Sequence, residues 1–144
     1  MCWIGRKDTK QIAKRDFYVY KIGLVLDNTF ISLYQKYIYR IKRNNPIIPL
    51  KPIEDNCGMI KIEDGYHSYK EVAIEFCQDP YLRDIYLGDA IKGFVDGLRL
   101  YSHLYLCTFI VPKGSEYYIN NRGEIVSSEI IYTGKYLRIS NFSK

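Results

Sequence analysis

The stretch "IVPKGSEYYINNRGEIVSSEIIYTGKYLRI" (residues 110–139) carries the clearest secondary-structure signal in this chain of 144 residues. Runs of β-branched and aromatic residues alternate in it with the turn sequences "PKG" (112–114) and "NNRGE" (120–124), and Thr133-Gly134 predicts a further turn. The preceding segment "HLYLCTFIV" (103–111) is typical of a buried strand. The last third of the chain is therefore predicted to be a meander of antiparallel strands.

The first third has the same character. "DFYVYKIGLVL" (16–26) is rich in aromatic and β-branched residues, and "DNT" (27–29) follows it as a turn. "FISLY" (30–34) and "YIYRIK" (37–42) continue the pattern. We expect two or three antiparallel strands here.

A proline-rich segment separates these strands from the middle of the chain. "RNNPIIPLKPIEDN" (43–56) carries prolines at positions 46, 49 and 52, which excludes a central strand or a helix. It is predicted to be a long extended loop. "GMIKIE" (58–63) then predicts a short strand that ends at Asp64-Gly65.

Helical spacing occurs only after these strands. In "YKEVAIEFCQ" (69–78) the apolar residues recur on one face, and Ser68 with Glu71 matches a capping box, which predicts a helix beginning there. "YLRDIYLGDAIKGFVDGLRLY" (81–101) predicts a second helix. The order of elements predicts a single α+β domain over residues 1–144, a largely antiparallel twisted sheet with about two helices packed on one face.

The composition predicts one domain that folds without a disulfide or a bound metal. Apolar residues make up 47% of the chain, enough for one core, and the fifteen tyrosines suit half-buried sheet faces as well as binding surfaces. The thiols show no Cys-x-x-Cys pair, and the histidines match no zinc module, so neither disulfide, metal nor cofactor is expected. The residues concerned are Cys2, Cys57, Cys77, Cys107, His67 and His103.

The chain lacks the apolar runs of membrane proteins. It holds no stretch of about eighteen apolar residues, and the opening "MCWIGRKDTK" lacks the apolar core of a signal peptide. We therefore expect a cytoplasmic protein that does not bind a membrane.

The net charge of +5 is unevenly distributed: residues 1–53 carry +8, residues 54–100 carry −5 and residues 101–144 carry +2. The basic first third is expected to attract phosphate groups, whereas the acidic middle is expected to repel a long nucleic-acid backbone. A small anionic ligand fits this distribution better than a duplex. An ordinary solvated surface would show the same charges.

The sequence lacks the common catalytic signatures. It has no phosphate-binding loop, no His-Glu-x-x-His, no Gly-x-Ser-x-Gly and no pair of His-x-Thr/Ser motifs. In "DGYHSYK" (64–70) a histidine lies between tyrosines at a turn, where His67 could donate to a phosphate or ribose. Local packing of His67 is the simpler interpretation.

Four segments together resemble small uncharacterised proteins of bacteriophages and prophages of gut bacteria. They are "IAKRDFYVYKIG" (12–23), "SLYQKYIYRI" (32–41), "DGYHSYK" (64–70) and "IVPKGSEYYINNRGEIVSSEII" (110–131). The resemblance implies a host-takeover or counter-defence factor. Some such factors capture nucleotide signals as molecular sponges.

The order of three other segments is similar to that of ADP-ribosyltransferases: "VYK" (19–21), "YHSY" (66–69) and "VPKGSEYYINNRGE" (111–124). The chain departs from the family because Lys21 stands where arginine or histidine is expected, no Ser-Thr-Ser follows, and Glu124 lies in a predicted turn. The resemblance implies a fold that binds ADP-ribose without turnover. An active transferase is the less favoured alternative.

Two functions of different class are left open. The first is sequestration of a small phosphorylated, nucleotide-like or ADP-ribose-like ligand; the second is inhibition of a host protein through a tyrosine-rich sheet or an edge strand. For the first, Lys21, Arg40, His67, Lys113 and Arg122 are assigned to charge, Tyr20, Tyr66, Tyr69 and Tyr117 to stacking, and Glu124 completes the predicted binding set. Tyr118 is expected on the face opposite Tyr117. Self-association is left open.

Overall fold

The computed structural model describes residues 3–6, 9–32, 38–54, 57–71 and 103–141. The regular elements of these residues are strands: β1 Trp3–Arg6, β2 Lys10–Ile12, β3 Phe17–Leu26, β4 Thr29–Ser32, β5 Ile38–Arg40, β6 Ile53–Glu54, β7 Met59–Ile62, β8 Tyr66–Tyr69, β9 His103–Val111, β10 Glu116–Ile119, β11 Glu124–Ser127 and β12 Ile131–Asn141. Nothing in this part of the chain is a helix long and apolar enough to cross a membrane.

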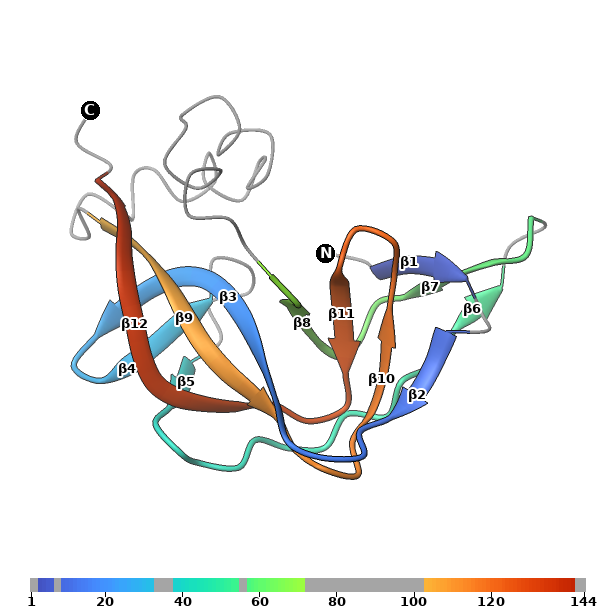
Figure 1. The fold of residues 1–144 in the computed structure, drawn as a ribbon, viewed down its shortest axis with the longest axis horizontal. Coiled ribbons are helices and arrows are strands. Elements are labelled where there is room, and N and C mark those ends of the chain that lie inside the picture. Colours follow the sequence, from blue (N-terminus) through green and yellow to red (C-terminus); the bar gives the residue numbers. More distant parts are fainter. Residues whose placement is uncertain (1–2, 7–8, 33–37, 55–56, 72–102, 142–144) are drawn as a thin grey trace.

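The prediction of an α+β domain is wrong. The described residues form two antiparallel sheets and contain no α-helix (Figure 1). Ser68 does not cap a helix, because it lies inside β8, between β11 and β3. Pairing on both sides of β8 outweighs the local capping pattern at this position. Residues 72–78 of the first helix candidate and the second candidate (81–101) lie outside the described residues.

The larger sheet has the strand order β12-β9-β3-β8-β11-β10-β2, and β4 and β5 extend it from β3. Two hairpins that the sequence indicates are present, β3–β4 and β10–β11. The turn at 112–114 joins β9 to β10 without pairing them: β9 pairs with β3 and β12, and β10 with β11 and β2, so the predicted meander of consecutive strands in the last third is wrong. Asp27 and Asn28 have φ angles of 48° and 64°, as a primed two-residue hairpin turn requires. The strand predictions over 16–34 and 103–131 are therefore confirmed wherever the structure describes them.

Part of this sheet closes on itself. Ile41, just after β5, forms a parallel bridge with Tyr132 of β12, and the Lys42 amide donates to the Tyr132 carbonyl at 2.8 Å. Strands β12, β9, β3, β4 and β5 thus form a ring, which we call the strand ring. The register of β12 shifts just after Tyr132, and Gly134, at φ 87°, lies so close that a Cβ there would be 3.0 Å from Ile41.

The predicted turn at Thr133-Gly134 is consequently a bulge inside one long strand, β12. A bulge bends a strand without reversing it, and glycine tolerates the positive φ that this geometry needs. The bend brings β12 against the end of β5. Sequence alone shows the glycine but not whether the chain reverses there.

Aromatic side chains fill the strand ring. Phe109 of β9 is central: its ring lies 5.0 Å from Phe30 and from Tyr132 and 5.3 Å from Tyr39, centroid to centroid. The contacts with Phe30 and Tyr39 are edge-to-face, the preferred geometry for aromatic pairs. Tyr39 and Tyr132 therefore serve the core, whereas the sequence favoured half-buried sheet faces for the tyrosines.

The smaller sheet has the order β1-β7-β6 and packs against β10 and β11 (Figure 1). Its core consists of Trp3, Ile60 and Ile62 together with Tyr118 and Val126 of the larger sheet, all buried. The Trp3 ring lies 5.4 Å from that of Tyr118. The seam between the two sheets therefore has an apolar core of its own.

Residues 43–52, which we call the proline strap, form neither strand nor helix, as predicted. The predicted loop is wrong at Ile53–Glu54, which form strand β6. The strap is tied down by backbone hydrogen bonds: the Ile48 amide donates to the Ser128 carbonyl at 2.9 Å, and the Tyr66 hydroxyl donates to the Pro46 carbonyl. Ile48 packs on the core of the strand ring, and Leu50 packs on the core of the seam. The strap therefore joins the two cores from outside.

Candidate functional site

The predicted binding residues do not form one site. Two of them, Arg40 and Lys113, are exposed at places far apart, on β5 and in the β9–β10 turn. The backbone amide of Lys113 donates a hydrogen bond to the Asp16 carboxylate at 2.7 Å. This bond fixes the backbone of the turn and does not involve the side-chain ammonium group of Lys113. Three others, Tyr20, Tyr69 and Glu124, are neighbours across β3, β8 and β11. The remaining five lie within the strands of the larger sheet or in its turns, and they are Lys21, Tyr66, His67, Tyr117 and Arg122.

Tyr117 and Tyr118 face opposite sides of β10, as predicted. Tyr118 is buried in the seam core, whereas Tyr117 packs on the core of the strand ring with its own ring 5.0 Å from that of Phe17. The Tyr117 hydroxyl donates to Gln11 of the neighbouring strand β2 at 2.7 Å. Its geometry is that of a sheet residue, so we do not place it in the candidate site.

Lys21 and His67 lie together inside the larger sheet. The Lys21 ammonium donates to the backbone carbonyl of His67 and lies 5.6 Å from the centre of the Tyr39 ring. Burial lowers the pKa of Lys21 to about 8. Burial, and after it the charge of Lys21, lowers the pKa of His67 to about 4. His67 is therefore neutral near pH 7 and brings no charge to a phosphate.

Tyr66 also has a structural partner. It is buried in the core of the strand ring, and its hydroxyl holds the proline strap through the Pro46 carbonyl. A stacking role would require an open ring face. Tyr66 therefore belongs to the interior of the fold, whereas Lys21 and His67 are half-buried.

Arg122 and Glu124 belong to the turn between β10 and β11. Arg122 Nε lies 2.9 Å from Glu124 Oε1, and the Asn120 side-chain amide donates to the same oxygen at 3.1 Å. Asn120 Oδ1 accepts from the backbone amides of Arg122 and Glu124, both at 3.0 Å. Asn120 thus organises the whole turn, and the Glu124 carboxylate is engaged in it.

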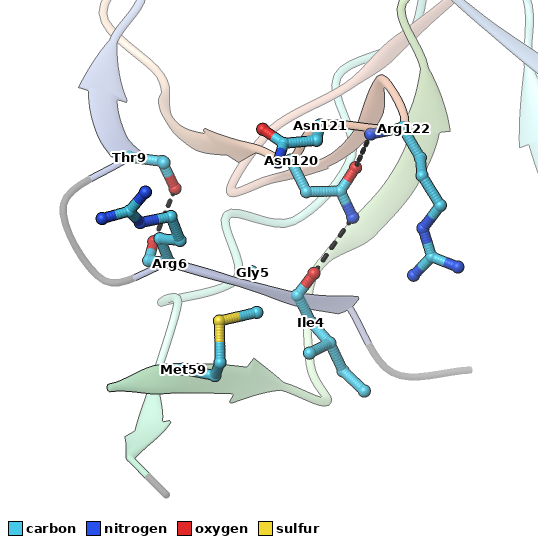
Figure 2. Close-up of a pocket in the computed structure, with 8 residues that line it drawn as sticks. All are labelled: Ile4, Gly5, Arg6, Thr9, Met59, Asn120, Asn121 and Arg122. Carbon is cyan, nitrogen blue, oxygen red and sulfur yellow. Dashed lines mark hydrogen bonds between the residues drawn. The ribbon is translucent and has the colours of Figure 1, made fainter. Parts of the chain in front are cut away.

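A pocket of about 190 Å³ opens beside this turn, between β1 of the smaller sheet and the β10–β11 hairpin (Figure 2). The Asn120 amide joins its two walls by donating to the Ile4 carbonyl at 3.0 Å. The lining residues are Ile4, Gly5, Arg6, Thr9, Met59, Asn120, Asn121 and Arg122. Figure 2 shows Arg6 and Arg122 on opposite sides of Asn120.

The local sequence explains the shape of this pocket. Gly5 is required because a Cβ there would lie 2.2 Å from the Trp3 ring, which folds back over it. Thr9 donates to the Arg6 carbonyl at 2.7 Å and so shapes the chain after β1. Ile4 and Met59 supply apolar surface, while the two arginines and two asparagines supply polar groups.

Of the residues that line the pocket, the sequence prediction included only Arg122; Arg6, Thr9, Asn120 and Asn121 were not among its candidates. Arg6 was counted only within the basic first third, and "NNRGE" was interpreted only as a turn. Arg6 and Arg122 are separated by more than a hundred residues, so only the packing of the two sheets reveals that they share a pocket. The local feature of the sequence that could have indicated this pocket is the pair Asn120 and Asn121 directly before Arg122.

Two kinds of reactive side chain can be assessed in the described residues: metal ligands and thiols. They contain no group of three or more His, Cys, Asp or Glu side chains that could hold a metal ion. Burial raises the pKa of the Cys107 thiol to about 12, so it is no nucleophile near neutral pH. Comparison with known proteins finds no matching family model, no matching curated sequence and no matching solved structure.

Proposed function

We propose that this protein binds a small phosphorylated ligand of nucleotide or ADP-ribose type in the pocket between β1 and the β10–β11 turn, without turning it over. One observation carries the proposal: Arg6 and Arg122, from different sheets, line the same pocket. Planar guanidinium groups bind phosphate oxygens through two parallel hydrogen bonds. The amides of Asn120 and Asn121 add donors for phosphate or ribose oxygens.

The size of the pocket limits what it encloses. At about 190 Å³ it is smaller than the roughly 300–1,000 Å³ of sites that enclose a whole drug-sized ligand. It suits a phosphoryl group with part of its sugar, and the rest of the ligand would lie over Ile4, which is 48% exposed. The proposed ligand is thus held mainly by its phosphate end.

The arrangement favours binding over catalysis. The Glu124 carboxylate, the residue at the place of a transferase glutamate, is held by Arg122 and Asn120 and is not directed at a reacting group. Thr9 donates its hydroxyl hydrogen to the Arg6 carbonyl. The described pocket therefore pairs no nucleophile with a base. The phage resemblance of the sequence supports sequestration of a host nucleotide signal as the purpose of such binding.

Calorimetric titration with ADP-ribose, nucleoside monophosphates and inorganic phosphate tests this proposal. Arg6→Gln and Arg122→Gln should each lower the affinity by about tenfold or more, because a hydrogen bond to a charged group contributes about 1.5–3 kcal/mol. The matched control is Arg40→Gln, which changes an exposed arginine on β5, outside the pocket, and should leave the affinity unchanged.

Two results would overturn the proposal. Absence of binding by the wild type to all of these ligands removes the binding function. Release of nicotinamide from NAD, abolished by Glu124→Gln, establishes the transferase-like alternative instead.

Rising salt concentration should weaken the binding of a phosphate group at this exposed site.

A further inference from the structure

The outward side of the proline strap is a second surface with recognisable chemistry, and it lies apart from the pocket. Its sequence is "RNNPIIPLKP" (43–52), in which Pro46, Pro49 and Pro52 recur every third residue. All three prolines are exposed. Between them, Ile47 is 68% exposed, the largest exposed fraction among the exposed hydrophobic residues.

Covalent geometry fixes most of the strap in one conformation. Each proline has its φ near −65°, and the residue before a proline is driven to extended or polyproline II geometry. Asn45, Ile48 and Lys51 are the residues before the three prolines. A polyproline II helix has three residues per turn, and in that conformation the three prolines share one ridge, in keeping with the exposure of all three.

The body of the protein holds the strap so that this ridge faces outward. Asn45 donates its side-chain amide to the Ile130 carbonyl at 2.8 Å, and the Ile48 amide donates to the Ser128 carbonyl at 2.9 Å. Ile48 and Leu50 turn to the two cores. The segment is thus ordered before any partner binds, which lowers the entropy that binding must overcome.

The charges on the strap indicate the kind of partner. Lys42, Arg43 and Lys51 are exposed and flank the proline ridge at both ends. Within the described residues none of these three side chains forms an ion pair. Basic residues beside a proline ridge are complementary to a groove with acidic residues at its rim.

We propose that the proline strap is a docking ligand for a protein domain whose groove is lined by aromatic rings and rimmed by carboxylates. Such grooves take preformed polyproline II segments with prolines at every third position. Arg43 precedes Pro46 by three residues and Lys51 follows Pro49 by two, so a cation lies at either end of the proline pair. The inference goes beyond ligand binding, and the strap shares no residue with the pocket.

The test titrates the full-length chain into a panel of purified SH3 and WW domains, which are domains with aromatic-lined proline grooves. At least one domain should bind, and Pro49→Ala and Lys51→Glu should each lower its affinity by about tenfold. Lys135→Glu is the matched control, because Lys135 is an exposed lysine of β12 outside the strap sequence.

The proposal is overturned if no domain binds the wild type, or if Lys51→Glu weakens binding no more than Lys135→Glu does. Lys51 is exposed, so its variant stays informative even if Pro49→Ala fails to fold. Loss of strap binding together with retained affinity for ADP-ribose would separate the two surfaces.

Discussion

The indole Nε1 of Trp3 donates a hydrogen bond to the backbone carbonyl of Glu124 at 2.8 Å, across the seam between the two sheets. Trp3 opens β1, and Glu124 opens β11, so this bond fixes the strand that carries Arg6 against the turn that carries Arg122. The pocket depends on that alignment. Glu124, predicted from sequence to contact a ligand, thereby acts through its backbone as part of the frame.

Trp3→Phe should lower the free energy of unfolding by about 1–3 kcal/mol, because it leaves the Glu124 carbonyl without its donor. The variant should also weaken ligand binding, since β1, which carries Arg6, is no longer fixed against the β10–β11 turn. Urea denaturation measures the first effect. Tyr18→Phe, at a residue that is 57% exposed, is the control and should change stability by less than about 0.5 kcal/mol. Equal stability of wild type and Trp3→Phe would show that the seam does not need this bond.

The effect of Lys21→Met on stability should be more favourable at pH 7 than at pH 10.5. The pKa of Lys21 is about 8 in the folded chain and 10.5 when solvated, so keeping it protonated in the fold costs up to about 3 kcal/mol at neutral pH. That cost disappears as the pH rises from 8 to 10.5, where only the unfolded chain holds the proton. Denaturation at pH 7 and at pH 10.5 should therefore show that the stability of the variant relative to wild type falls as the pH rises. A relative stability independent of pH would contradict the assigned pKa.

His67 should make the fold sensitive to acid. Its pKa of about 4 lies below the solvated value of 6.5, so the unfolded chain binds a proton first as the pH falls. Stability contributed by the neutral ring is complete above pH 6.5 and is lost between pH 6.5 and 4, by up to about 3 kcal/mol. His67→Gln should flatten this part of the pH profile of the melting temperature. An unchanged profile would show that other groups cause the acid loss.

Tyr66→Phe should loosen the proline strap without unfolding the protein. It removes one hydrogen bond, that to the Pro46 carbonyl, worth about 1 kcal/mol. The strap is joined to the body nearby by the Ile48 amide, so hydrogen exchange of that amide should accelerate in the variant. Tyr117→Phe, which loses a hydroxyl contact on the far strand β2, is the control. Unchanged exchange at Ile48 would mean that Tyr66 does not hold the strap.

The parts of the fold that sequence predicted are those governed by local chemistry. Asp27-Asn28 and the turn "NNRGE" define their hairpins because few residue types accept those backbone angles. Ser68 was misassigned because its local capping pattern is real, but pairing with β11 and β3 overrides it. Closure of the strand ring at Ile41 and Tyr132 is a contact between distant segments that no periodicity reveals.

The candidate site follows the same division. Arg122 was identified because it lies in an evident turn, whereas its partner Arg6 comes from a strand of the other sheet. Lys21 and Tyr66 were chosen for their residue type, yet both face the interior, where alternation along a strand places them. Residue type predicts what a side chain can do. Sheet packing determines which side chains meet.

The most direct measurement is a nuclear magnetic resonance titration of the labelled wild-type protein with ADP-ribose and, separately, with inorganic phosphate. We expect chemical-shift changes confined to Arg6, the Asn120 and Asn121 side-chain amides and the backbone of residues 121–123, because these groups border the pocket. Inorganic phosphate should shift the same signals more weakly. Shifts centred on Tyr20 and Tyr69, or no shifts at saturating ligand, would contradict the assignment of the pocket as a phosphate-binding site.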